Sequence, residues 1–249
     1  MVDNSVYKQK FHIRNFDVDF NGKLKLNMLL NFLQESAAEH AGKLNLSGLD
    51  LLKKNLAWIM SRYHISISYY PEQGETIEVS TWPSVVEGIF TLREYEIRAS
   101  EKKAVQATSS WMALDLQSKK PVKIKKTLPS FPLYSRRAVH DDFRPLPDVE
   151  NTDIELRFPV LKEDLDFNRH VNNVVYIQWA VETAPEDVVM DLRPTQIEVN
   201  YKNETYYGDC VVSRTQKLRS GKGPHYIHQL VKESDGREIA RLRTEWADL

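Results

Sequence analysis

Four polar residues in the second half of the chain have side chains suited to acid–base chemistry on a carbonyl compound. They are Asp166, Asn168, His170 and Glu204. A histidine titrates near neutral pH, and a general acid or base contributes on the order of 10² to 10⁴-fold to a reaction rate. Asp166, Asn168 and His170 alternate, so in an extended loop their side chains would lie on one side. We expect Asp166 to orient the imidazole and Glu204 to approach from an adjacent strand.

The segment DLDFNRHVNNVVYIQWAVE, residues 164–182, positions three of these four residues. Its polar first part predicts a loop, and its apolar second part predicts a helix that is buried on nearly all sides. Free backbone N–H groups at a helix start suit a reaction that develops negative charge on oxygen. The alternative is that Asp166 and Asn168 only cap the helix and that His170 is a core residue. Spacing alone leaves both interpretations open.

A second copy of this segment lies in the first half of the chain. Residues 17–37 read DVDFNGKLKLNMLLNFLQESA and residues 164–184 read DLDFNRHVNNVVYIQWAVETA, with a constant offset of 147. Such self-similarity near half the chain length indicates a duplicated unit. Lys23 occupies the place of His170, so any histidine chemistry belongs to the second copy alone.

The rest of the chain predicts the same order of elements twice. A strand within residues 7–16 precedes a helix from about Leu24 to Leu44, and a short amphipathic helix or turn follows between Leu46 and Asn55. Four segments rich in β-branched and aromatic residues then fill 56–116. The second half repeats strand, helix and strands from about Ile154. We predict an α+β fold with a sheet wrapped around a helix in each half, and the boundaries 1–130, a linker at 131–150, and 151–249.

Composition excludes several classes of function. The 249 residues include 34 Lys plus Arg and 35 Asp plus Glu, and the net charge of −1 does not indicate a nucleic-acid partner. Cys210 is the only cysteine, which excludes an intrachain disulfide and fits a reducing compartment. The first residues lack the apolar core of an export signal and no run of 18 apolar residues occurs, so we expect a cytoplasmic protein without membrane insertion. Nucleotide and zinc motifs are missing, and we expect no cofactor and no metal.

A lysine cluster precedes the predicted linker. Two interpretations fit it: a solvated surface, or a docking surface for an acidic partner. Its members are Lys119, Lys120, Lys123, Lys125 and Lys126, with Arg136 and Arg137 further along.

The segment DLDFNRHVNNVVYIQWAVE resembles the Asp-x-Asn-x-His-Val-Asn-Asn signature of the acyl-acyl carrier protein thioesterases. The resemblance extends through WIMSRYHISISYYPEQGETIEVSTW, SSWMALDLQSKKPVKI and YKNETYYGD, and so covers nearly the whole chain. It implies two hot-dog domains in tandem and hydrolysis of the thioester between a fatty acyl group and the phosphopantetheine of an acyl carrier protein. The family's catalytic Asp, Asn, His and Glu fall on Asp166, Asn168, His170 and Glu204.

This chain departs from many plant members at Thr205, where they carry a cysteine directly after the glutamate. We therefore expect water attack rather than a cysteine nucleophile, with Thr205 as a competing covalent nucleophile. Cys210 is expected to be a small buried residue. The first domain would supply an acyl tunnel and chain-length selectivity, and the lysine cluster would dock the acidic carrier protein. The residues expected to contact substrate are Met28, Leu29, Phe32, Leu33 and Thr205.

Three rival functions remain at this stage, and the third, hydratase chemistry on a similar fold, lacks its usual motifs in this sequence. An acyl-coenzyme A thioesterase would prefer coenzyme A thioesters, and a noncatalytic acyl-binding module would bind without turnover. The sequence leaves the oligomeric state open, a homodimer included.

Overall fold

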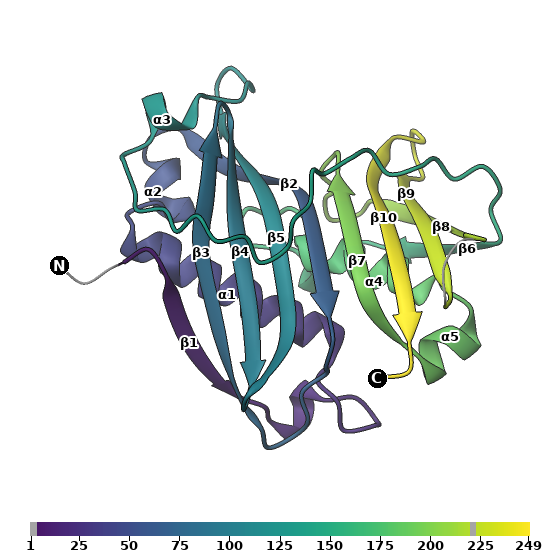
Figure 1. Ribbon diagram of the computed structural model, residues 1–249. Coiled ribbons are helices and arrows are strands. Elements are labelled where there is room, and N and C mark those ends of the chain that lie inside the picture. Colours follow the sequence, from purple (N-terminus) through teal and green to yellow (C-terminus); the bar gives the residue numbers. More distant parts are fainter. Residues whose placement is uncertain (1–3, 220–222) are drawn as a thin grey trace. The chain divides into compact units, whose positions relative to one another are not determined.

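The computed structural model describes residues 4–219 and 223–249, which form two compact units divided between Asp142 and Phe143. Each unit has a long helix beside an antiparallel sheet (Figure 1). This confirms the predicted α+β fold, a double hot-dog, and the predicted order of strand, long helix and strands in each half. Within the described residues, no helix has both the length and the apolar character needed to span a bilayer.

The sheet of the first unit has the strand order β1-β3-β4-β5-β2, antiparallel throughout. Its helix α1 packs against β1 and β3. The elements are β1 Tyr7–His12, the 3-10 helix η1 Asn15–Asp17, α1 Leu26–Lys43, α2 Gly48–Leu52, β2 Leu56–Ile67, β3 Thr76–Glu87, β4 Phe90–Ala99, β5 Lys102–Asp115 and α3 Ile124–Thr127.

The sheet of the second unit has the strand order β6-β8-β9-β10-β7, again antiparallel. This is the order of the first unit with each strand replaced by its counterpart, which is what a duplication predicts. The elements are β6 Ile154–Pro159, η2 Lys162–Asp164, α4 Asn173–Glu182, α5 Glu186–Asp191, β7 Arg193–Tyr201, β8 Cys210–Lys217, β9 His225–Lys232 and β10 Glu238–Ala247. The short helix α5 has no counterpart in the sequence prediction.

The two long helices bury different shares of their surface. In α1 the buried residues recur at helical spacing, as Leu29, Leu33 and Ala37 illustrate, and the opposite face is exposed. In α4 all but a few side chains are buried, as its continuous apolar run predicts. The helix α1 begins two residues later than predicted, because Leu24 is extended and forms a β-bridge with Val18.

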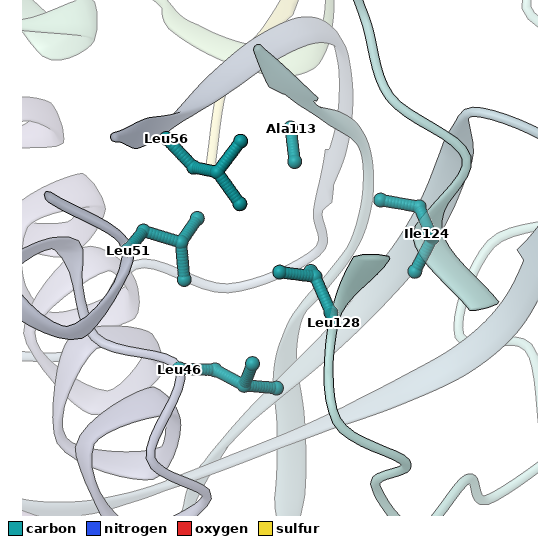
Figure 2. Close-up of a cluster of buried hydrophobic side chains, with 6 residues drawn as sticks. All are labelled: Leu46, Leu51, Leu56, Ala113, Ile124 and Leu128. Carbon is teal, nitrogen blue, oxygen red and sulfur yellow. The ribbon is translucent and has the colours of Figure 1, made fainter. Parts of the chain in front are cut away.

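A compact apolar cluster fixes α3 to the first unit. Ile124 and Leu128, at the two ends of α3, pack with side chains from α2, β2 and β5 (Figure 2). Because these two residues point inward, the lysines beside them point to solvent. The cluster consists of Leu46, Leu51, Leu56, Ala113, Ile124 and Leu128.

Residues 134–141 have no regular secondary structure but bind to strands of the first unit. The Tyr134 N–H donates to the Pro83 carbonyl oxygen (2.9 Å), and Arg137 Nε donates to the buried Glu94 carboxylate (2.8 Å). Arg136 pairs with Glu96 (3.1 Å). The assignment of Arg136 and Arg137 to the same cationic surface as the lysines is therefore wrong, because both guanidinium groups bind carboxylates of β4.

Candidate functional site

Residues 165–171 form a tight turn rather than the extended loop that the alternating polar residues suggested. A β-bridge joins Leu165 to Val171, the Asp166 N–H donates to the His170 carbonyl oxygen (2.8 Å), and the Arg169 N–H donates to the Asp166 carbonyl oxygen (3.0 Å). Arg169 takes a left-handed conformation, with φ at 64°. The turn brings the ends of the segment together and leaves Asn168 exposed near its tip.

Asp166 holds this turn through the main chain. Its Oδ1 accepts hydrogen bonds from the N–H groups of Asn168 (2.8 Å) and His170 (3.1 Å). The carboxylate therefore positions the backbone of His170, whereas the imidazole itself contacts Glu204 and Tyr206. Asp166 was expected to orient the imidazole, and in the structure it contacts His170 through the main-chain N–H.

The helix α4 is capped by a different residue. Asn172 Oδ1 accepts a hydrogen bond from the Val174 N–H (3.0 Å), so Asn172 is the N-cap. Neither Asp166 nor Asn168 caps α4, which contradicts the interpretation of these two residues as simple helix caps. None of the described residues forms a hydrogen bond with the side-chain amide of Asn168.

Glu204 and His170 lie together in the second unit. The Val171 N–H donates to the Thr205 carbonyl oxygen (3.0 Å), which fixes the segment after β7 beside the turn. His170 Nδ1 is then 3.4 Å from Glu204 Oε1. The two side chains are 34% and 44% exposed, so both groups can be reached by solvent.

Tyr206 completes this cluster and was missed by sequence reasoning. Its hydroxyl donates to Glu204 Oε2 (3.0 Å), and its ring meets the His170 ring edge to face, with centroids 5.1 Å apart and planes at 88°. The only sequence signal was its place two residues after Glu204, in a turn segment rich in polar and aromatic residues.

Thr205 faces the interior of the unit. Its side chain is fully buried, its Oγ1 lies 2.8 Å from the Tyr176 hydroxyl oxygen, and its N–H donates to the same hydroxyl (3.2 Å). Burial raises the pKa of the Tyr176 hydroxyl to about 12. This hydroxyl therefore stays protonated and is no base for Thr205 at neutral pH.

Cys210 is the first residue of β8 and is half-buried, so it is less enclosed than expected. Burial raises the pKa of its thiol, as does a hydrogen bond with Glu233. The thiol form is thus favoured over the reactive thiolate.

The first unit repeats the turn with different chemistry. Asp19 Oδ1 accepts from the N–H groups of Asn21 (2.9 Å) and Lys23 (3.2 Å), as Asp166 does 147 residues later. Gly22 has φ at 75° where Arg169 has 64°. Lys23 Nζ pairs with Glu72 Oε1 at 2.7 Å. The two turns thus share one backbone design, and only the second carries an imidazole.

The remaining predicted residues lie in the first unit. Leu29 and Leu33 are fully buried, Phe32 stacks on Phe11 with centroids 4.4 Å apart, and Met28 is half-buried. The five lysines on and before α3 are all exposed. They are Lys119, Lys120, Lys123, Lys125 and Lys126.

Two antiparallel sheets in tandem, each beside a long helix, define a double hot-dog protein, and the His170–Glu204 pair lies in the second unit. The chain belongs to the acyl-ACP thioesterase family: the N-terminal domain of that family matches residues 4–130 and the C-terminal domain matches residues 148–248.

Relatives of known name support the assignment. The chain is 28% identical over 260 residues to the chloroplastic palmitoyl-acyl carrier protein thioesterase of Cuphea hookeriana, covering 98% of this chain and 63% of that protein. It is 27% identical to oleoyl-acyl carrier protein thioesterase 2 of Arabidopsis thaliana, covering 99% of this chain and 78% of the relative. The chain therefore spans less than two thirds of the length of some of these plant proteins.

Solved structures agree with the fold. An acyl-ACP thioesterase from Bacteroides thetaiotaomicron is 25% identical and superposes with a TM-score of 0.82, covering 98% of each chain. A structure described as a putative oleoyl thioesterase from Lactobacillus plantarum is 24% identical, with a TM-score of 0.87 over 100% of this chain and 98% of that chain.

Proposed function

We propose that this protein hydrolyses fatty acyl-acyl carrier protein thioesters and releases free fatty acid during fatty acid biosynthesis. The observation that carries the proposal is the His170–Glu204 pair, 3.4 Å apart and accessible, in a chain of the acyl-ACP thioesterase family. A carboxylate next to an imidazole is an acid–base unit able to activate water near neutral pH.

In the proposed mechanism a water molecule attacks the thioester carbon. Glu204, with His170 beside it, takes a proton from the water as its oxygen bonds to the carbonyl carbon. The carbonyl oxygen gains negative charge, which the exposed Asn168 amide and the first N–H group of α4, that of Asn173, stabilise. The C–S bond then breaks, the proton passes to the sulfur, and the fatty acid and the carrier's phosphopantetheine thiol leave.

We assign Asp166 a supporting role in this mechanism, and we assign the role of nucleophile to water and not to Thr205. Asp166 accepts the N–H groups that define the turn and so fixes His170 and Asn168. The Thr205 hydroxyl lies in the interior against the protonated Tyr176 hydroxyl, and a covalent nucleophile needs an adjacent base. This geometry favours water over Thr205 as the nucleophile.

The first unit is proposed to select the acyl chain. Its turn carries Lys23 in an ion pair and has no imidazole, so chemistry is not its role. The apolar residues Met28, Leu29, Phe32 and Leu33 of α1 are proposed to line or back the site of the chain. Each buried methylene is worth about 0.8 kcal/mol, so the depth of such a site sets the preferred length.

The carrier protein is proposed to dock on the lysine cluster. Carrier proteins of this kind are acidic, and five exposed lysines within residues 119–126 give a local positive field on a chain of net charge −1. Ile124 and Leu128 hold this segment by their apolar side chains. We place the reaction in the cytoplasm, in keeping with a single unpaired cysteine.

The test is turnover of purified protein against a series of acyl-carrier thioesters of increasing length, with the matching coenzyme A thioesters alongside. We expect His170→Ala and Glu204→Gln each to lower kcat by about 10² to 10⁴-fold. The control Lys23→Ala changes the equivalent position of the first unit and should stay near the parent rate. A preference for coenzyme A thioesters would favour the rival thioesterase, and binding without turnover would refute hydrolysis.

The same series tests the assignment of selectivity. A chimaera that takes residues 1–130 from a relative of different chain-length preference should adopt the relative's product profile. An unchanged profile would remove the first unit from substrate selection.

A further inference from the structure

Tyr206 contacts both members of the acid–base pair. Its hydroxyl donates to Glu204 Oε2 at 3.0 Å, and its ring packs against the His170 ring with centroids 5.1 Å apart. Burial raises the pKa of this hydroxyl, as does its bond to Glu204, so it remains a hydrogen-bond donor at neutral pH. We propose that Tyr206 is a positioning residue that holds the Glu204 carboxylate next to the His170 imidazole; this inference rests on the proposed function.

The pair needs such a support because both of its side chains are partly exposed. A glutamate at 44% exposure has several accessible rotamers, and its carboxylate would spend much of its time away from the imidazole. The bond from Tyr206 engages Oε2 and leaves Oε1 directed at His170 Nδ1. Tyrosine suits this role, since its side chain has only two rotatable angles before the hydroxyl.

The backbone of Tyr206 is itself tied down. Its N–H donates to Asp209 Oδ2 (3.0 Å), and the Asp209 N–H donates back to the Tyr206 carbonyl oxygen (3.1 Å). Asp209 Oδ1 in turn pairs with Lys232 Nζ (2.8 Å) on β9. Gly208, with φ at 88°, closes this turn in a conformation that glycine adopts without strain. The backbone of Tyr206 therefore lies in a turn that hydrogen bonds and an ion pair hold in place.

The duplicated unit gives independent support for this geometry. There, the Glu72 N–H donates to Glu75 Oε2 (2.7 Å), the Glu75 N–H donates to the Glu72 carbonyl oxygen (3.2 Å), and Gly74 has φ at 86°. Glu72 is thus the counterpart of Tyr206, and its carboxylate reaches Lys23, the counterpart of His170, at 2.7 Å. In both units this turn position directs its side chain to the same place in the neighbouring turn, Lys23 in the first unit and His170 in the second.

The decisive variant is Tyr206→Phe, which keeps the ring and removes only the hydroxyl. The matched control is Tyr207→Phe at the adjacent residue, whose side chain is exposed and bonds to none of the described residues. Steady-state rates with an acyl-carrier thioester are measured from pH 5 to pH 9, on samples checked for unchanged thermal unfolding. We expect kcat of Tyr206→Phe to fall by about 10- to 100-fold, with KM within about twofold of the parent.

The pH profile separates positioning from a merely structural effect. A hydrogen bond to a carboxylate favours its charged form, so its removal should move the acidic limb of the kcat profile of Tyr206→Phe to higher pH. Tyr207→Phe should keep both the rate and the profile. If the parent is active and Tyr206→Phe keeps the parent's kcat and pH profile, this inference is overturned and the proposed function stays intact. A parent without any thioesterase activity would overturn both.

Discussion

The choice between water and Thr205 as the nucleophile can be decided by Thr205→Val, a substitution that keeps the side-chain shape and removes the hydroxyl. In the structure this hydroxyl is fully buried and its neighbour is the Tyr176 hydroxyl, at 2.8 Å. The substitution leaves the Tyr176 O–H without its partner in the interior. An orphaned buried polar group costs about 1 to 3 kcal/mol, so we expect the free energy of unfolding to fall by that amount.

The reverse deletion should cost more. Tyr176→Phe removes the acceptor of the Thr205 N–H (3.2 Å) as well as the partner of its hydroxyl, so two polar groups lose a bond instead of one. In the double variant only the backbone N–H of residue 205 is left without a hydrogen-bond partner, because both hydroxyls are gone. The cost of the double variant should therefore be smaller than the sum of the two single costs by the cost of two orphaned hydroxyl groups, about 2 kcal/mol or more.

Urea unfolding gives the stabilities of the four proteins of this cycle, and turnover of one acyl-carrier thioester gives their activities. We expect Thr205→Val to retain kcat within about threefold, because a water molecule needs no hydroxyl from Thr205. Loss of a covalent nucleophile would instead cost on the order of 10³-fold or more. Such a loss in a variant that is still folded at the assay temperature, or an acyl group trapped on Thr205, would refute the water mechanism.

Two further predictions concern the second unit's core and the lysine cluster. His228 is fully buried between the hydroxyls of Thr215 (2.7 Å) and Thr244 (2.9 Å), and burial lowers the pKa of its imidazole from 6.5 to about 3. The unfolded chain therefore binds a proton that the folded chain excludes, so stability falls as pH decreases from about 6.5 toward 3, by about 2 kcal/mol at pH 5 for this group. His228→Gln should lose about that much less stability between pH 7 and pH 5 in urea titrations, and an identical pH dependence would contradict the assignment. For the lysine cluster, Lys123→Glu with Lys125→Glu should raise KM for acyl-carrier substrates several-fold and spare small thioesters, whereas Lys102→Glu with Lys103→Glu, at the other end of β5, should do neither; equal effects on both substrate types would remove the docking proposal.

Element order could be predicted because it depends on local patterns. Apolar residues at helical spacing predicted α1, the continuous apolar run predicted the buried α4, and runs of β-branched and aromatic residues predicted the strands. The repeated segment gave the duplication, which the matching strand order of the two sheets confirms. The short α5 was missed, because six residues after a proline carry little periodicity.

The turn of the site could not be predicted from its own residues. Alternation of Asp166, Asn168 and His170 fits an extended strand and a tight turn equally well. A signal did exist in the first copy, where glycine stands at the position of Arg169, since a glycine within a polar loop often marks a left-handed conformation. The burial of Glu94 is a second case: no pattern within β4 indicates it, because its cover, residues 134–141, comes from about 40 residues further along the chain.

The two turns also explain why we assign the proposed proton transfer to one copy and not to the other. In each turn the equivalent aspartate, Asp19 or Asp166, accepts the N–H of Lys23 or His170, so the difference lies in the side chains on a common backbone. In the first unit Lys23 Nζ meets the Glu72 carboxylate at 2.7 Å, and this hydrogen bond lowers the pKa of Glu72, so its carboxylate does not take up a proton at neutral pH. In the second unit the carboxylate comes from Glu204, whose counterpart is the buried Tyr70, and Tyr206 occupies the place of Glu72. Replacing Lys23 alone by histidine would therefore not build the proposed acid–base site in the first unit. Glu72 would still stand where the second unit has Tyr206, and Tyr70 would stand where it has Glu204. All three side chains would have to change together.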